Sequence, residues 1–105
     1  MRIIDIGHQY ELENFEAKND PGQVLQFIKK IPDEAKNDGT LVTVADGTTN
    51  EEVLRVLIDR IQTLQLKFPC RENAIVLTNL ETALLWLGKR TADRAKRGVE
   101  GKAVE

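Results

Sequence analysis

Histidine and cysteine, which carry much of enzyme and metal chemistry, are almost absent from this sequence. Its 105 residues include one histidine, His8, and one cysteine, Cys70. A single cysteine excludes an internal disulfide and fits a reducing compartment. The two residues lack the spacing of metal ligands, and no second histidine is present to activate Cys70 as a nucleophile. We therefore expect no metal site and no catalytic residue, and we interpret Cys70 as a structural thiol at the start of a helix.

Glycine-rich phosphate loops and long apolar runs are also missing. The stretch DGTTNEE at residues 46–52 has neither the lysine nor the glycines of a P-loop, and the acidic residues are scattered. No apolar run approaches the length of about eighteen residues that a membrane span requires, and Asp5 interrupts any signal-peptide pattern. The sequence thus predicts a soluble, cytosolic chain without a cofactor, catalytic activity or membrane contact.

Aromatic residues make up 5% of the chain, and the net charge is −2 with a pI near 5.5. Both observations argue against binding of DNA or RNA polymers, which favours a basic surface and, for single strands, aromatic stacking platforms. The charge is divided, because residues 1–52 hold eleven acids and five bases whereas residues 53–105 hold six acids and ten bases. This asymmetry suits head-to-tail association of subunits, or an anionic ligand held by the C-terminal half.

Three segments in the first half of the chain favour extended structure, at residues 2–15, 23–31 and 40–46. β-Branched residues crowd the third segment, and turn-forming stretches at residues 19–22 and 32–39 separate the three. The middle segment also suits a short helix. We expect a small antiparallel sheet of three strands.

Apolar residues recur at helical spacing in the second half. A capping box beginning at Thr49 predicts a first helix from about Asn50 to Lys67, which Pro69 ends. A second helix is expected from Arg71 to Arg97, and its short connection to the first implies an antiparallel hairpin. The predicted contact stripes are Leu54, Leu57, Ile58, Ile61 and Leu64 on the first helix, and Val76, Leu80, Ala83 and Leu87, broadened by Leu77, Leu84 and Gly88, on the second.

The fold class is therefore expected to be α+β, with a small N-terminal antiparallel sheet followed by a long two-helix hairpin. We divide this single domain into a β-rich segment at 1–48, the hairpin at 49–98 and a flexible tail at 99–105. A chain this short buries a modest core, and its apolar faces are wider than one hairpin needs. The remaining surface, which includes Trp86, indicates an oligomer.

The stretch KRTADRAKR at residues 89–97 carries five bases. Arg90, Arg94 and Arg97 recur at i, i+4 and i+7, so they share a helical face in line with the predicted apolar stripe. Positive charge at a helix C-terminus stabilises the helix by roughly 0.3–1 kcal/mol per charge. Three arginines on one face also suit phosphate or carboxylate, because the guanidinium fork binds both oxygens at once. The residues alone leave both interpretations open.

Arg71 and Asn73 raise the same question at the start of the second helix. A positive charge there opposes the helix dipole, which suggests a specific acidic partner or a phosphate near the helix-start amides. The amide of Asn73 is suited to reading a base edge or a ribose. Each residue also fits ordinary surface.

The block from Asp46 to Gly101 resembles the phage sponge family that counters bacterial Thoeris immunity. The motifs PCREN (69–73), LETALLWL (80–87) and KRTADR (89–94) carry this resemblance. The hairpin is also similar to the related sponge that counters CBASS, and IDIGHQYELENF at 4–15 is similar to the Thoeris-type members alone. The resemblance implies a non-enzymatic protein of the host cytoplasm. Such proteins form dimers or hexamers and hold cyclic ADP-ribose isomers made by TIR enzymes at subunit interfaces, without cleavage.

The resemblance also implies roles for individual residues. Asn73, Arg90 and Arg94 would line the cyclic ADP-ribose pocket; beyond the resemblance, we expect Arg97 to add long-range attraction. Arg71 matches a position that contacts cyclic di- or trinucleotides in a separate pocket. Thr63 stands where the family pattern leads us to expect an aromatic residue that stacks on adenine, which puts ligand affinity and isomer preference in doubt.

We therefore expect a phage anti-defence protein that sequesters a cyclic ADP-ribose signal. Two rival hypotheses remain, of which the first uses the same basic helix. In the first, the helix binds an acidic surface of a host protein. In the second, the protein is a small hydrolase of the signal.

Overall fold

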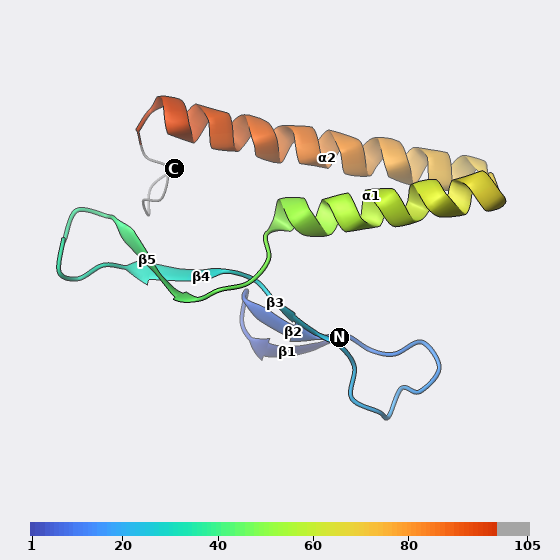
Figure 1. Ribbon diagram of the computed structural model, residues 1–105, viewed down its shortest axis with the longest axis horizontal. Helices are drawn as coiled ribbons and strands as arrows, with labels where there is room; N and C mark the ends of the chain where they lie inside the picture. Colours follow the sequence, from blue (N-terminus) through green and yellow to red (C-terminus); the bar gives the residue numbers. More distant parts are fainter. Residues whose placement is uncertain (99–105) are drawn as a thin grey trace. The chain divides into compact units, whose positions relative to one another are not determined.

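The computed structural model describes residues 1–98, so the tail expected at 99–105 lies outside the described residues. The chain divides into an N-terminal unit, Met1–Thr49, and a second unit that begins at Asn50. Figure 1 shows the order of the elements: β1 (Arg2–Asp5), β2 (Gln9–Glu11), β3 (Val24–Gln26), β4 (Lys29–Pro32), β5 (Leu41–Ala45), α1 (Asn50–Lys67) and α2 (Arg71–Lys96). A small antiparallel sheet followed by a helical hairpin confirms the expected α+β class.

The strands pair differently from the expected arrangement. The first extended segment holds two strands, because Gly7 takes a left-handed φ of 79° and turns the chain between β1 and β2. The middle segment forms β3 and β4 rather than a helix. β3 completes a three-stranded sheet in the order β1-β2-β3, whereas β4 pairs with β5 in a separate two-stranded sheet.

One face of the three-stranded sheet gathers apolar side chains. Ile3 lies opposite Tyr10, which lies opposite Leu25, and opposed residues in antiparallel strands point to the same side. The rings of Tyr10 and Phe27 meet edge to face with centroids 6.1 Å apart. The Lys29 ammonium donates to the carboxylate of Asp5 at 2.9 Å and so ties β4 to β1.

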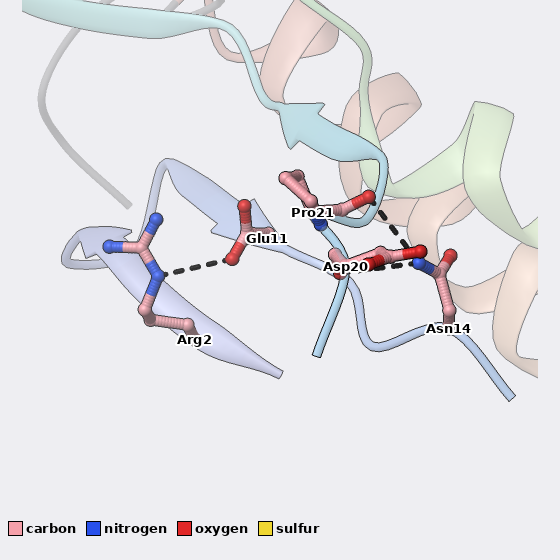
Figure 2. A network of polar contacts seen from close by, with 5 residues as sticks. All are labelled: Arg2, Glu11, Asn14, Asp20 and Pro21. Carbon is pink, nitrogen blue, oxygen red and sulfur yellow. Dashed lines mark hydrogen bonds and ion pairs between the residues drawn. The ribbon is translucent and has the colours of Figure 1, made fainter. Parts of the chain in front are cut away.

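Side-chain to backbone hydrogen bonds hold the loop between β2 and β3. The Asn14 amide donates to the carbonyl oxygens of Ala17, Asp20 and Pro21, each at 3.3 Å. Figure 2 shows Asn14 reaching Asp20 and Pro21, beside the Arg2–Glu11 ion pair of 3.2 Å that links β1 to β2. These hydrogen bonds therefore stabilise a loop that has no regular secondary structure and that leads to β3.

The helical hairpin has the predicted boundaries. α1 runs over the expected residues, and α2 ends at Lys96 with Arg97 as its C-cap, one residue earlier than expected. Figure 1 shows the two helices side by side and antiparallel. Their seam consists of half-buried side chains at helical spacing: Leu54, Ile58, Ile61 and Gln65 on α1, and Leu77, Leu80, Ala83, Leu84 and Leu87 on α2.

Four residues of the predicted stripes, Leu57, Leu64, Val76 and Gly88, are exposed instead. Leu57, Leu64 and Val76 keep 36–40% of their surface exposed. No apolar side chain in the described part of the chain is buried, and Arg94, 6% exposed, is the buried residue there. Within residues 1–98, no helix combines the length and the apolarity that crossing a membrane requires.

Candidate anion-binding site

The C-terminal part of α2 extends beyond the start of α1, the helix that packs against the rest of α2. α2 has 26 residues and α1 has 18. At a rise of about 1.5 Å per residue, the difference leaves roughly 12 Å of α2 beyond the start of α1. Figure 1 shows this overhang at the end of α2. The last eight residues of α2, Lys89 to Lys96, therefore lie beyond the length that α1 can cover.

A pocket of about 260 Å³ lies on this overhang, lined by Trp86, Lys89, Arg90, Asp93, Arg94 and Arg97. Trp86, Arg90, Asp93 and Arg97 follow one another at i, i+4, i+7 and i+11, the spacing of a single helical face. Four of the six lining side chains are cationic and one is an acid. The Lys89 ammonium donates to the Asp93 carboxylate at 2.9 Å, so this acid is already paired.

The arginines of this pocket differ in their exposure. Arg94 is buried, whereas Arg90 and Arg97 are exposed. Arg94 follows the seam residue Leu87 by seven positions, and Arg90 follows the seam residue Ala83 by seven, so both extend the line of the seam, while Arg97 follows Arg90 by seven. The spacing therefore agrees with the expected alignment of these arginines with the seam, and among the three Arg94 is the buried one. Because guanidinium stays charged even when buried, Arg94 supplies a fixed positive charge at the pocket wall.

Helix stability explains part of this charge. Arg94 and Lys96 lie in the last turn of α2, where they complement the helix dipole. Lys89 and Asp93 form the i, i+4 ion pair that the spacing predicts. Arg90 precedes the last turn and lies outside that pair, so neither effect accounts for it. Its charge is the most suitable in the pocket for an anionic ligand.

The structure separates the other predicted site residues from this pocket. Asn73 lies half-buried in the first turn of α2, seventeen positions before Arg90, which corresponds to roughly 25 Å along the helix axis. Arg71 is exposed at the same end. Within one chain, Asn73 and Arg71 therefore do not share a pocket with Arg90.

Thr63 lies on the side of α1 that faces away from the seam. Its hydroxyl donates to the carbonyl oxygen of Asp59 at 3.0 Å, an interaction within the helix. It lines a hollow of about 360 Å³ together with Val56, Asp59, Arg60, Leu64 and Lys67. This hollow is separate from the arginine pocket within one chain, because the two share no lining residue.

Another hollow, of about 250 Å³, lies in the N-terminal unit. Its lining residues include the bases Arg2 and Lys18 and the acids Glu11, Glu13 and Asp20. Acids outnumber bases, and Arg2 already pairs with Glu11. A phosphate-bearing ligand therefore fits the α2 pocket better. In the part of the chain that the structure describes, no three His, Cys, Asp or Glu residues are grouped to hold a metal ion.

The start of α2 is fixed by hydrogen bonds around Cys70. The Cys70 sulfur accepts from the backbone N–H of Asn73 at 3.5 Å, which makes Cys70 the N-cap and confirms its place at the helix start. The side chain of Gln65 spans the turn, donating to the Cys70 carbonyl at 2.8 Å and accepting from the Cys70 N–H at 3.0 Å. Sequence reasoning missed this contact, which no helical periodicity indicates.

Sequence reasoning also missed Trp86 as a pocket residue and assigned it to an oligomer surface. Trp86 precedes Arg90 by four positions, and this spacing in the sequence could have indicated that both side chains lie on one face of the helix. The pocket thus combines an indole, a buried guanidinium and two exposed guanidinium groups. This combination suits a ligand that carries both phosphate and a flat apolar ring.

Comparisons with known proteins identify similar sequences. Residues 26–92 match the family described as Acb2/Tad1, hairpin domain. The matched range includes Trp86 and Arg90. Over 58 residues the chain is 53% identical to a protein of Bacillus phage SBSphiJ7 named Thoeris anti-defense 1. That alignment covers 54% of this chain and 41% of the relative, so the matched part is less than half of the relative's length.

Proposed function

We propose, from the premise that this chain belongs to the Acb2/Tad1 hairpin-domain family, that it is a phage anti-defence protein acting against Thoeris immunity. In this proposal it binds a cyclic ADP-ribose signal in the host cytoplasm and sequesters it without cleavage. Family membership confirms the resemblance seen in the sequence. The name of the phage relative supports a role against Thoeris immunity, and the arginine pocket supports binding of a phosphate-bearing ligand.

The observation that carries this proposal is the set of arginines in one pocket of α2. A cyclic ADP-ribose carries a diphosphate, and arginine binds phosphate oxygens through paired, charge-assisted hydrogen bonds. Arg90 and Arg94 would hold the diphosphate, and Arg97 would add long-range attraction. None of the lining residues forms an arrangement of nucleophile and base, so binding without cleavage fits the pocket better than hydrolysis.

The remaining assigned roles require a second copy of the chain. Asn73 and Arg90 lie roughly 25 Å apart along α2, more than a single cyclic nucleotide spans. We therefore infer that Asn73 of one copy, reading base or ribose, completes the pocket of Arg90 on another copy, in a dimer or a hexamer. Thr63 would reach the ligand in the same way. Arg71, exposed at the far end of α2, would serve a separate pocket for cyclic di- or trinucleotides.

Uptake followed by heat release tests this proposal. The purified protein is mixed with TIR-derived cyclic ADP-ribose, separated from free ligand and heated, and the released ligand is identified by mass. We expect intact ligand. Degraded ligand would indicate a hydrolase, and the absence of uptake would contradict both functions and favour the hypothesis of a protein-binding helix.

A double substitution, Arg90→Ala with Arg94→Ala, tests the site. Each lost charge-assisted hydrogen bond costs about 1.5–3 kcal/mol, so we expect the Kd to rise by roughly a hundredfold or more. The control removes two exposed bases outside the pocket, Arg55→Ala with Lys96→Ala, for the same change in net charge. Equal losses of affinity in the two variants would show that net charge, and not the pocket, governs binding.

A further inference from the structure

Trp86 is the one residue of the arginine pocket that carries a large apolar ring. It is the single tryptophan of the sequence, and 65% of its surface is exposed. The neighbouring residues Leu84 and Leu87 are half-buried in the helix seam. Trp86 lies on another side of α2, where the other lining residues of the pocket are charged. Packing of the hairpin therefore does not explain this indole.

The spacing between Trp86 and the arginines fits the dimensions of a nucleotide. Arg90 follows Trp86 by four positions, roughly 6 Å along the helix and on nearly the same side. A base and the phosphate attached to its ribose are separated by a similar step. A base lying on the indole would thus place its phosphate beside the guanidinium of Arg90, with Arg94 fixed behind it at the pocket wall.

We propose that Trp86 is the base-stacking platform of this pocket. A purine ring lies against the indole face while Arg90 and Arg94 hold the phosphates, so the pocket selects ligands that carry a planar base next to a phosphate. This inference rests on the proposed function and names the feature of the signal that the pocket reads. Stacking on an aromatic side chain is tolerant of base identity, because every base has a π-face. Trp86 therefore selects for the presence of a base, and other groups select its identity.

The single tryptophan makes this contact directly observable. Titration with TIR-derived cyclic ADP-ribose should quench the intrinsic tryptophan fluorescence of the wild-type protein in proportion to uptake. Inorganic pyrophosphate, which has the phosphates but no base, should compete for the arginines and leave the emission unquenched. Uptake of cyclic ADP-ribose with unchanged Trp86 emission overturns the stacking inference and leaves the proposed function standing.

Two substitutions separate stacking from bulk. Trp86→Phe keeps an aromatic face and should stay within a few-fold of the wild-type Kd for cyclic ADP-ribose. Trp86→Leu keeps an apolar side chain without the π-face and should lose roughly tenfold to a hundredfold. The affinity for pyrophosphate should be the same in both variants. Equal affinity of the leucine and phenylalanine variants for cyclic ADP-ribose overturns the inference.

Oligomer mass, measured by light scattering, is the last readout. We expect Trp86→Leu to retain the wild-type mass. A fall in mass that accompanies the loss of binding overturns the inference, because Trp86 would then act by holding subunits together. If the wild-type protein takes up no cyclic ADP-ribose in any of these measurements, the proposed function itself fails. The two failures are therefore distinguishable.

Discussion

Gln65 shows how one side chain sets the geometry of the hairpin. Its amide donates to and accepts from the backbone of Cys70, at 2.8 and 3.0 Å, across the turn between α1 and α2. Cys70 in turn caps α2 by accepting from the backbone N–H of Asn73, and so fixes the backbone of Asn73 in the first turn of the helix. Amide groups are suited to this role because they present a donor and an acceptor side by side. A residue that periodicity places on the seam thus acts through hydrogen bonds.

We expect Gln65→Ala to destabilise the hairpin by about 1–2 kcal/mol, since it removes two neutral hydrogen bonds of about 0.5–1.5 kcal/mol each. Gln65→Glu keeps the acceptor for the Cys70 N–H and loses the donor, so its loss should be intermediate. Urea unfolding followed by circular dichroism measures both. Gln62→Ala, an exposed glutamine on the same helix, is the control. Equal midpoints for Gln62→Ala and Gln65→Ala would contradict this account.

At the scale of the elements, the helices were predictable and the strand pairing was not. Helix boundaries depend on local signals, such as the Pro69 break after α1 and the spacing of apolar residues. Strand pairing depends on contacts between distant segments. The Phe27 N–H donates to the His8 carbonyl at 2.7 Å and the Ile28 N–H donates to the Thr48 carbonyl at 2.9 Å. These two hydrogen bonds lie where the chain leaves the three-stranded sheet and enters the two-stranded sheet. No periodicity in residues 23–31 indicates that this segment is divided between two sheets.

The ion pair between Asp5 and Lys29 makes the stability of the N-terminal unit depend on pH. The hydrogen bond from Lys29 lowers the pKa of Asp5 below its usual value of 3.8. A carboxyl group with a lowered pKa in the folded state stabilises that state above its unfolded pKa, and loses this contribution as the pH falls through the folded pKa. The stability of this unit should therefore decrease below about pH 4.

Asp5→Asn tests this contribution, because it keeps the shape of the side chain and removes the titrating group. We expect a smaller difference in urea midpoint between pH 7 and pH 3 for Asp5→Asn than for the wild-type protein. Added salt should reduce the wild-type difference, since both side chains are partly exposed. The exposed Asp20→Asn serves as the control. An unchanged pH dependence in Asp5→Asn would assign the effect to other carboxyl groups.

At the scale of the whole molecule, the hairpin leaves apolar side chains exposed beside its seam. Leu57, Leu64 and Val76 remain 36–40% exposed beside the seam, and burial of apolar surface contributes about 25 cal/mol per Å². The grouping of Arg90, Arg94 and Arg97 could be predicted from the sequence because all three belong to one helical segment. The two-copy site that we propose was not predictable in this way, because Asn73 and Arg90 lie at opposite ends of that helix and the sequence of one chain does not show which of its surfaces would meet in a dimer.

If two copies share the proposed pocket, the positions of Asn73 and Arg90 limit how the two copies can be arranged. They lie nine positions before and eight positions after Thr82, so two α2 helices that cross antiparallel near Thr82 bring Asn73 of each copy to Arg90 of the other. Such a dimer holds two equivalent pockets, each built from both copies.

Mixing two inactive variants tests this shared pocket. Asn73→Ala and Arg90→Ala should each lose uptake of cyclic ADP-ribose when expressed alone. In a mixed dimer, one pocket receives both substitutions and the other receives neither, so co-expression should restore up to one intact pocket per mixed dimer. The control co-expresses Arg90→Ala with Arg94→Ala, two changes that lie in the same half of the pocket and therefore damage both pockets of a mixed dimer. Recovery in the first mixture but not in the second would require Asn73 and Arg90 to come from different copies, whereas no recovery in either would contradict the shared pocket.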